Sequence, residues 1–358
     1  MKIAALETIK LKIPLNKPMR TRHINLEQAF CLLLILKTDE GLEGQGLIRT
    51  VSLSDVQLVE NFIKIFFAPN LLEKEFTTPE KLWLSLWLNK RNHLQSSYGL
   101  YALAAIDIAL WDLLGKAAQK PLHQLLNIEE KHIPVYGNGG WLIDTNKEMV
   151  TDIVWYLDRG CKYFKMRIGS DNDLTRIQFL RQTFGSELEL IVDANQFYDF
   201  ASAVEMSKIL AEYDVLWFEE PLYSASITEL SHLAELSSIP IATGENMNSH
   251  WQIKDACELK AAQILQPDVI YQGGITEFVR SAEIINDYGL KLGAHLFHEL
   301  SLSLAGLANQ HYVEHIDFFP DDFFNNDFTI TNGKIVLPET PGHGVTISDR
   351  SIQKYQFF

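Results

Sequence analysis

The 358-residue chain has little of what several common protein classes require. Its three cysteines, Cys31, Cys161 and Cys257, are far apart, odd in number and without a CxxC pair. Neither a disulfide framework nor a zinc knuckle is supported, and reduced thiols are expected. A cluster of basic residues is also missing, and at a formal net charge of −15 nucleic-acid phosphates would repel the chain. We expect no nucleic-acid partner.

Long apolar runs and targeting signals are scarce as well. The apolar stretch "CLLLILKTDEG" is broken by charged residues well short of the roughly 18 apolar residues that a membrane-spanning helix needs. The N-terminal "MKIAALETIKLKIPLNKP" reads as an alternating strand and lacks the apolar core and cleavage site of a secretory signal. These features predict a soluble, cytoplasmic protein without a membrane partner.

The length fits one large α/β barrel with an additional part, and residues 1–128 differ in pattern from the rest of the chain. Two apolar segments, "IAALETIKLKIPL" and "AFCLLLILKTDEGLEGQGLI", predict antiparallel strands, the second turning at "DEG". Three helical stretches come next, the last with apolar residues at spacings of three and four. Residues 1–128 are therefore expected to form an α+β domain. The polar segment "NKPMRTRHINLEQ" between the strands predicts a mobile loop.

Residues 129–319 alternate short apolar strands with amphipathic helices, which requires a parallel sheet. Seven or eight such units favour a closed barrel over an open doubly wound sheet, although the pattern alone allows both. A glycine fingerprint for dinucleotides and a Walker-type phosphate loop are missing after these strands, which weakens the open-sheet alternative. The strand candidates are "IPVYG", "KYFKMRI", "LELIVDA", "VLWFEE", "IPIATGE", "AAQILQPD" and "LKLGAHL".

Residues 320–358 form a third segment with turn signals of its own. Asn332-Gly333 is a hairpin signal, and a Pro-Gly loop comes after it. We expect this segment to pack back on residues 1–128 and to complete that domain.

Three acidic residues, Asp193, Glu219 and Glu245, end three successive predicted strands and are evenly spaced, one βα unit apart in each case. The carboxyl ends of parallel barrel strands face one mouth, where barrel enzymes place their sites. Three converging carboxylates repel one another unless a cation neutralises them, and oxygen ligands select a hard ion such as Mg²⁺. Taken singly, each could instead be a solvated acid on a loop. The even spacing of all three favours a metal site.

Asp268 and His295 end the next two predicted strands, again one βα unit apart. A carboxylate beside an imidazole accepts its N–H, sets the tautomer and raises the basicity of the ring. The pair could therefore act as a base. A lone histidine among apolar residues is more often a packing residue, and it is the spacing from Asp268 that favours the chemical role.

Lys165 and Arg167 lie two residues apart on a predicted strand, so both side chains point to one face. If that face is the barrel interior, two cations lie near the metal and opposite the histidine. The alternative is an exposed edge strand, which the apolar neighbours of these residues disfavour. Glu314 falls where the eighth strand should end and is either a hydrogen-bonding group of the site or an exposed acid.

A metal held by three carboxylates, with two cations and a His-Asp pair around it, could bind a substrate carboxylate and remove the proton from the carbon beside it. The resulting enediolate is doubly negative, so a metal and a nearby lysine must stabilise it while His295 takes the proton. An acidic protein can bind an acidic small molecule in this way, because the positive charge is focused inside one cleft. The expected partner is a small-molecule carboxylate.

The chain carries the helix "AIDIALWDLLGK" and, in this order, the motifs "FKMRIG", "VDANQ", "FEEP", "TGEN", "PDVIYQGGIT", "AHLFHE" and "VEHID". With these motifs it resembles the mandelate racemase subgroup of the enolase superfamily over essentially its full length. The resemblance implies a modified (β/α)7β barrel of TIM type under an α+β capping domain, assembled as a homo-oligomer. It implies one Mg²⁺ per subunit on the three acids. It also implies Lys165 near the substrate carboxylate, His295 with Asp268 as catalytic base and Glu314 as electrophilic partner.

The resemblance also points to residues that would contact the substrate. Asn195 lies close to the ligand in similar enzymes, and cap loops, here residues 19–28 and 50–54, determine which substrate enters. Arg20, Arg22 and His23 could meet a polar or distal anionic group, or be ordinary exposed charges. His298, at a loop-to-helix entry, could line the pocket or simply cap and pack.

One departure from the family pattern affects the expected reaction. Similar enzymes commonly carry KxK on this strand, the second lysine serving as a base, whereas this chain has Arg167. A guanidinium is a poor proton acceptor, so two-base racemisation is put in doubt. We therefore expect an acid-sugar dehydratase that converts a 2,3-dihydroxy acid to a 2-keto-3-deoxy acid. The alternatives are a racemase or epimerase, and a catalytically silent protein that binds Mg²⁺ and a sugar acid.

Overall fold

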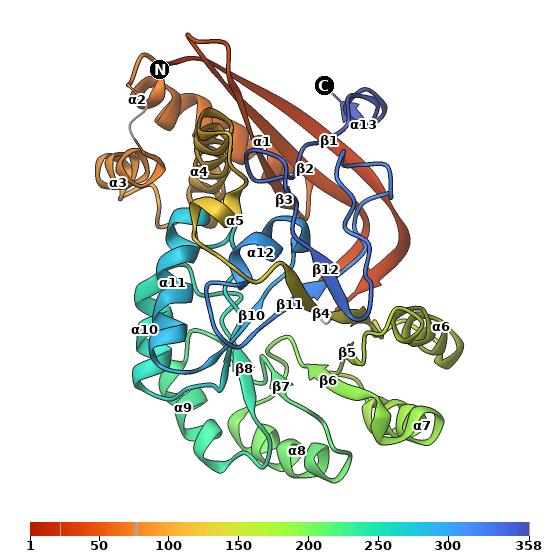
Figure 1. Ribbon diagram of the computed structural model, residues 1–358. Coiled ribbons are helices and arrows are strands. Elements are labelled where there is room, and N and C mark those ends of the chain that lie inside the picture. The colour runs from red at the N-terminus through yellow and green to blue at the C-terminus, as the bar shows by residue number, and fades with distance from the viewer. Residues whose placement is uncertain (22, 76–77, 358) are drawn as a thin grey trace.

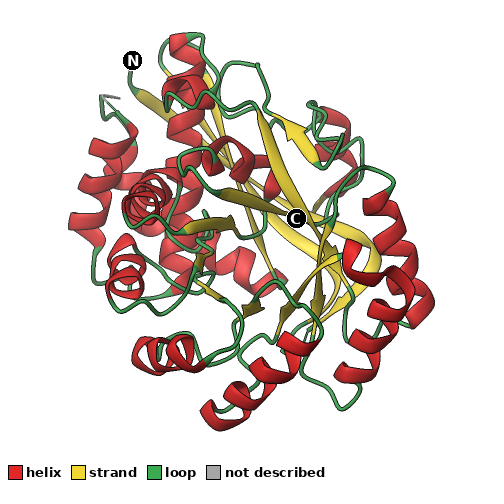
Figure 2. Ribbon diagram, turned by 60° about the horizontal axis from the view of Figure 1, so that its bottom comes forward, coloured by secondary structure: helices red, strands yellow, loops and turns green. Residues whose placement is uncertain are grey.

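The computed structural model describes residues 1–21, 23–75 and 78–357. Its centre is a barrel of eight parallel strands in the order β4 to β11, which closes because β11 pairs with β4. A separate four-stranded antiparallel sheet, in the order β13-β1-β2-β3, lies against one end of the barrel (Figure 1). Helices surround the barrel strands on the outside (Figure 2). The expected α/β barrel with an α+β cap is confirmed, and the open sheet is excluded.

Each of the seven segments predicted as strands contains one barrel strand, and an eighth lies at the position expected for Glu314. The strands are β4 (His132–Gly139), β5 (Tyr163–Arg167), β6 (Glu189–Asp193), β7 (Phe218–Glu219), β8 (Ile241–Thr243), β9 (Ile264–Leu265), β10 (Lys291–Ala294) and β11 (His311–His315). The helical segments after them are α6 (Asn146–Leu157), α7 (Asp173–Phe184), η2 (Gly185–Glu187), α8 (Phe200–Glu212), α9 (Ile227–Leu236), α10 (His250–Glu258), α11 (Ile275–Asp287) and α12 (His298–Ala305).

The register of the barrel brings strand-end residues to one level. Arg167 pairs with Asp193, and Asp193 pairs with Glu219, across β5, β6 and β7. Alternate side chains of these strands point into the barrel, while Met166 and Val192 point outward and join the core under the helices. The C-terminal strand ends therefore present their polar side chains to one mouth.

The antiparallel sheet and its helices come mostly from the first third of the chain. They comprise β1 (Ile3–Arg20), β2 (Asn25–Thr38), β3 (Glu43–Thr50), α1 (Leu53–Asn61), the π-helical η1 (Phe62–Phe67), α2 (Ala68–Leu71), α3 (Pro79–Lys90), α4 (Ser97–Ala118) and α5 (Leu122–Leu125). The turn predicted at "DEG" is present between β2 and β3, with Gly41 at φ 84°.

The segment predicted as a mobile loop between β1 and β2 is mostly strand. Met19 pairs with Leu26 and Arg20 pairs with Asn25, so the two strands stay paired up to the turn that connects them. The prediction was wrong because the two strands continue their hydrogen bonds past a register shift between Pro14 and Met19. Met19 is buried, so an apolar side chain anchors this polar segment. Arg22 lies outside the described residues.

Helix α4 is long and apolar enough, by length and composition, to cross a membrane, but 83% of its most apolar window is buried inside the protein. It packs closely on β3. A Cβ added at Gly46 would lie 1.9 Å from the carbonyl oxygen of Ala105, and one at Gly44 would lie 2.2 Å from that of Ala109. The two glycines thus allow backbone-to-backbone contact, and the apolar surface of α4 is used for packing.

A buried hydrogen-bond cluster joins α4 to the barrel helix α11. The carboxylate of Asp107 accepts hydrogen bonds from the backbone N–H of Thr276 at 2.8 Å and from its hydroxyl at 2.7 Å. Trp111 donates to the same hydroxyl oxygen at 3.0 Å. Burial raises the pKa of Asp107 to about 7, although the hydrogen bonds from Thr276 oppose the shift. This attachment to the barrel is therefore sensitive to pH.

We expect Asp107→Asn to reduce the pH dependence of stability. The folded pKa of Asp107 is raised, so its stabilising effect is fully present below the ordinary value of 3.8 and is lost as the pH rises to about 7. Relative to that of the variant, the free energy of unfolding of the wild type should fall by on the order of a few kcal/mol between about pH 4.5 and about pH 7.5. Thermal unfolding of both proteins across this range measures the difference. A difference that does not change with pH would contradict the prediction.

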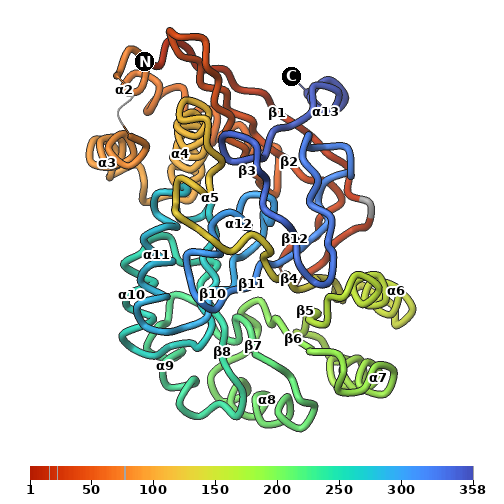
Figure 3. The backbone as a smooth tube through the Cα atoms, in the orientation of Figure 1, coloured from red at the N-terminus to blue at the C-terminus, as the bar shows by residue number. Residues whose placement is uncertain are grey.

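The last segment returns to the cap along the side of the barrel. Asn332 and Gly333 have φ values of 51° and 72° in a turn bridged by Thr331 and Lys334, which confirms the predicted hairpin. Strand β12 (Lys334–Val336) then pairs with β4 of the barrel, and β13 (Gln356–Phe357), after α13 (Asp349–Tyr355), pairs with β1. Both chain ends thus lie at the cap end of the molecule (Figure 3).

Candidate active site

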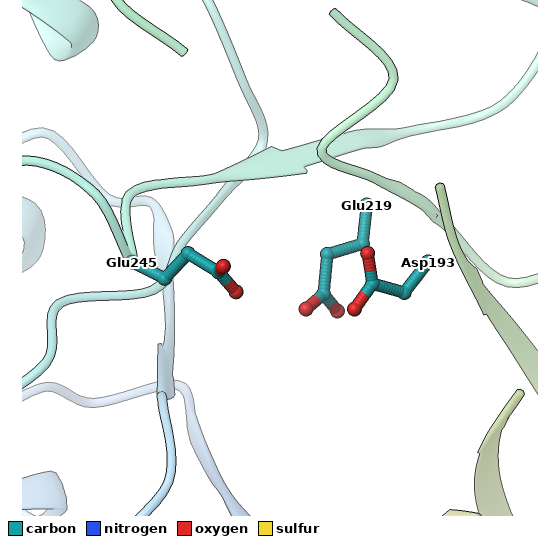
Figure 4. Close-up of side chains that lie close together, drawn as sticks. All are labelled: Asp193, Glu219 and Glu245. Carbon is teal, nitrogen blue, oxygen red and sulfur yellow. The ribbon is translucent and has the colours of Figure 1, made fainter. Parts of the chain in front are cut away.

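Three carboxylates converge at the barrel mouth. Asp193 ends β6, Glu219 ends β7, and Glu245 follows β8 after Gly244, which has φ 133°. One carboxylate oxygen from each lies within 4.8 Å of the other two. Asp193 and Glu219 lie side by side, and Glu245 faces them (Figure 4). Three oxygen donors at this separation fit one hard divalent cation.

The surroundings shift the acidity of these carboxylates. Burial raises the pKa of Glu219 to about 7, against the opposing effect of the Lys165 ammonium. Burial also acts to raise the pKa of Glu245, but the contact with His295 outweighs it and lowers the pKa to about 2. Neighbouring carboxylates with such different acidities indicate a site in which charge is strongly concentrated.

Two cations reach the site from β5. The Nζ atom of Lys165 lies 2.7 Å from Glu219 and 2.5 Å from Glu314, and its side chain is completely buried. The Nε atom of Arg167 lies 3.2 Å from Asp193, and its guanidinium lies over the ring of Trp141, with Cζ 4.6 Å from the ring centre. The exposed-strand alternative for β5 is thus wrong, because both side chains lie inside the barrel.

Asn138 is a site residue that the sequence-based predictions did not include. It lies on β4, accepts a hydrogen bond from Arg167 at 2.8 Å, and donates a short one to Glu314. Its position, one βα unit before Lys165, repeats the spacing of the other strand-end residues and could have identified it. Asn138 thereby fixes Arg167 and Glu314 relative to each other.

His295 lies across the mouth from the two cations. Its Nδ1 atom is 2.9 Å from Asp268, and its Nε2 atom is 3.1 Å from Glu245 and 3.9 Å from Glu314. Burial acts to lower the pKa of His295, but the facing carboxylates outweigh burial and raise it well above the ordinary value. The structure thus brings His295 and Asp268 together as predicted. Asp268 contacts the Nδ1 atom of the ring, and the Nε2 atom faces Glu245 and Glu314.

The backbone after His295 is unusual, since Leu296 and Phe297 both have positive φ values of 46° and 41°. This left-handed turn aims the N–H of Leu296 at Glu314, which accepts its hydrogen bond at 3.2 Å. Strain of this kind costs about 1–3 kcal/mol per residue and is common where a strand end must position a functional group. Glu314 is therefore a buried member of the site, and the exposed-acid alternative for it is wrong.

A second buried acid, Glu220, supports the chain on both sides of Glu245 and was also missing from the predicted set. It accepts hydrogen bonds from the hydroxyl of Thr243 at 2.5 Å and from Asn246 at 3.2 Å. Burial raises its pKa to about 8. The motif "FEEP" contains this residue, but the sequence alone does not separate the acid that faces the mouth from the one that supports the loop.

A cavity of about 250 Å³ lies above these groups, under the β1–β2 hairpin. Its charged lining includes Arg49, Arg167, Glu245 and His295. Asn195 also lines it, held by two hydrogen bonds to Asp193 at 2.8 and 3.2 Å, and its buried side-chain oxygen has no partner among the described residues. Asn195 therefore has an unused hydrogen-bond acceptor beside the cavity.

The other residues predicted to contact the substrate do not share one cavity. His23 lines the same cavity and lies 3.0 Å from the carbonyl oxygen of Asn195. The side chain of Arg20 is exposed, and the described lining of this cavity does not include it. Buried His298 lines a separate cavity of about 280 Å³ with Glu299 and His315. Helix α12 turns His298 away from the mouth that His295 faces, which favours a packing role.

Comparison with known proteins agrees with this fold. Residues 148–351 match the family described as enolase C-terminal domain-like, and residues 4–127 match the N-terminal domain of mandelate racemase / muconate lactonizing enzyme. Arabinonate dehydratase of Saccharolobus solfataricus is 28% identical over 335 residues, which cover 90% of this chain and 89% of the relative. The 3,6-anhydro-alpha-L-galactonate cycloisomerase of Streptomyces coelicolor is 29% identical over 272 residues, covering 75% of each chain.

A solved structure of L-talarate dehydratase from Polaromonas sp. JS666, complexed with Mg and L-glucarate, superposes with a TM-score of 0.92. It is 27% identical and covers 100% of this chain and 98% of its own. The barrel and the cap thus agree with the two family matches. The chain belongs to the mandelate racemase / muconate lactonizing enzyme family of the enolase superfamily.

Proposed function

We propose that the protein is a Mg²⁺-dependent acid-sugar dehydratase, a hydro-lyase that converts a 2,3-dihydroxy acid to a 2-keto-3-deoxy acid. The observation that carries this proposal is the asymmetry of the site. On one side of the three carboxylates lies a histidine that can act as a base, His295, which is hydrogen-bonded to Asp268. On the other side lies Arg167, which is paired with Asp193. One strong base is enough for dehydration, whereas two-base racemisation needs a second proton acceptor. Dehydratases among the relatives support this choice.

Asp193, Glu219 and Glu245 would hold the Mg²⁺ ion, since their oxygens are close enough to share one cation. When bound, the ion supplies Lewis-acid stabilisation of a substrate carboxylate as negative charge develops on it. The Lys165 ammonium, buried between Glu219 and Glu314, would add a second positive charge beside the same oxygens.

In the proposed reaction, the Nε2 atom of His295 takes the proton from C2, the carbon beside the carboxylate. Asp268 holds the other ring nitrogen and stabilises the imidazolium that results. The electron pair left at C2 forms the C2–C3 double bond as the C3 hydroxyl departs as water. That hydroxyl takes its proton from His295, and the N–H groups of Arg167 hydrogen-bond to the substrate on the opposite side. The enol product becomes the keto acid by tautomerisation.

A screen of aldonates, aldarates and uronates with Mg²⁺ tests this function, using keto-acid formation as the readout. In D₂O we expect a keto acid with deuterium at C3, because the enol is protonated by solvent. Recovered substrate should keep its C2 configuration. Inversion with deuterium at C2 and no keto acid would overturn the dehydratase proposal in favour of an epimerase. Binding without any turnover would favour the silent binding protein.

We further propose three features that rest on the resemblance and on the chain pattern. The capping domain comprises residues 1–128 and 320–358, and residues 129–319 form the catalytic barrel. The protein acts in the cytoplasm, and it assembles as a homo-oligomer. Light scattering on purified protein tests the assembly.

A further inference from the structure

Arg49, near the end of β3, is a cation of the cavity that the proposed chemistry does not use. It lines the cavity of about 250 Å³ that also contains Glu245 and His295. It lines a neighbouring cavity of about 340 Å³ as well. Its side chain is half-buried, with the guanidinium carbon 4.1 Å from the centre of the Phe318 ring. Arg49 therefore lies where two parts of one larger space meet.

The guanidinium of Arg49 has no ion pair with a carboxylate and no hydrogen bond among residues 1–21, 23–75 and 78–357. The two other cations at this mouth are paired, Lys165 with Glu219 and Arg167 with Asp193. Burial raises the pKa of Glu299, a nearby acid, to about 8, which keeps this acid largely uncharged at neutral pH. A half-buried arginine without a counter-ion has lost part of its hydration, and an ion pair with a bound anion would compensate for that loss.

The lining of the two cavities shows which end of a substrate Arg49 would meet. Glu245, His295 and Arg167 line the first cavity, and the described lining of the second includes none of them. Arg49 is shared by both, as is Tyr271. The second cavity carries side-chain hydroxyls, which suit a polyol chain. Those hydroxyls belong to Thr50, Ser96, Ser97, Tyr98, Tyr101 and Tyr271. The carboxylate of Asp55, which accepts a hydrogen bond from the Tyr98 hydroxyl at 2.9 Å, also lines this cavity. Arg49 thus lies on the side of the space away from the reacting groups.

We propose that Arg49 binds a second carboxylate at the far end of the substrate, so that the preferred acid sugar is a dicarboxylate. The inference rests on the proposed function, because the first carboxylate is taken to lie at the three acids. A guanidinium offers a planar fork of N–H donors that matches a carboxylate in two hydrogen bonds. A monocarboxylate of equal length ends in a hydroxymethyl group, which leaves that fork without an anion. Arg49 is thus a specificity-determining residue.

Matched substrate pairs that differ only at C6 test this assignment: galactarate against galactonate, and glucarate against gluconate. With Mg²⁺ and wild-type protein, we expect kcat/KM to be higher for the dicarboxylate of the pair that fits the stereochemistry of the site. Arg49→Met keeps the apolar contact with Phe318 and removes the charge. It should raise KM for the dicarboxylate by about 10- to 100-fold at nearly unchanged kcat, and leave the monocarboxylate within about twofold. Arg49→Lys should restore part of the loss.

Arg91→Met is the matched control, because Arg91 is an exposed arginine at the end of α3 and is not among the lining residues of either cavity. This variant should behave as wild type with both substrates. If Arg49→Met impaired both members of a pair equally, or neither, Arg49 would have only a structural role and the proposal would fail.

The failure of this inference can be separated from failure of the dehydratase function. Turnover of monocarboxylates without turnover of dicarboxylates would overturn the role of Arg49 and leave the dehydratase intact. If neither class is dehydrated, calorimetric titration of Mg²⁺-loaded wild type with galactarate and galactonate decides the matter. Tighter binding of galactarate, lost in Arg49→Met, would support the distal carboxylate site. Equal binding of the two would overturn it.

Discussion

His295→Asn is expected to lower kcat for keto-acid formation by about 10³-fold, because the variant lacks the group that takes the C2 proton. Asparagine fills a similar volume and can still hydrogen-bond to Asp268, which lies 2.9 Å from the ring in the wild type. The fold and the metal site should therefore survive. The measurement is single-turnover and steady-state keto-acid formation, together with deuterium incorporation at C3 of the keto acid in D₂O. Both should be lost together.

Asp268→Asn provides a graded control for this prediction. The histidine remains, but its orientation and the stabilisation of its charged form are weakened, so we expect a smaller loss, about 10²-fold. Phe297 and Leu296, with their left-handed backbone, still hold the strand end in place. If His295→Asn kept near-wild-type keto-acid formation, the base would have to be another residue, and the proposed mechanism would be wrong.

The second large effect is expected at the three carboxylates. Glu219→Gln removes a ligand and a negative charge from the proposed cation site, so we expect activity to fall by more than about 10³-fold at ordinary Mg²⁺ concentrations. Chelation of Mg²⁺ should reduce the wild type to a similar level, reversibly. Keto-acid formation at increasing Mg²⁺ measures both effects. A variant with unchanged activity and unchanged Mg²⁺ dependence would show that the three acids do not hold the catalytic ion.

The same site makes a prediction about stability that does not depend on the substrate. Ligand binding stabilises the folded state by mass action, by about 2.7 kcal/mol at a ligand concentration 100 times the Kd. Mg²⁺ should therefore raise the midpoint of thermal unfolding of the wild type, and Glu219→Gln should abolish most of this increase. Glu187→Gln, at an exposed glutamate in η2, is the control and should respond to Mg²⁺ as wild type does. An equal response of all three proteins would argue against ion binding at the acids.

Much of the architecture could be predicted from residue pattern alone. Apolar strands alternating with amphipathic helices allow few folds, because every parallel strand needs a crossover helix and both faces of the sheet must be buried. The even spacing of Asp193, Glu219 and Glu245 places them one βα unit apart, and the structure indeed brings them to one mouth. The β1–β2 hairpin was mistaken for a loop, because polar residues there face outward while Met19 is buried.

Residue pattern alone could not predict which side chains would connect site residues that lie far apart in the chain. Asn138 connects Arg167 with Glu314 across strands that are far apart in the chain, and Glu220 supports the ligand loops from below. Arg49 belongs to the antiparallel sheet, so its place above the barrel mouth depends on how the sheet packs on the barrel. Local periodicity carries no information about that packing.

Residue pattern was enough to show which polar residues stand at the strand ends, because the carboxyl ends of parallel barrel strands all face one mouth. It also determined that Arg167, a residue that does not readily release its proton, replaces the usual second lysine. Which polar side chains share the cavity depends on the packing of the whole fold. His295 and Arg49 face it, whereas His298, three residues after His295, lies in another cavity, because side-chain direction depends on backbone turns and on packing between distant segments.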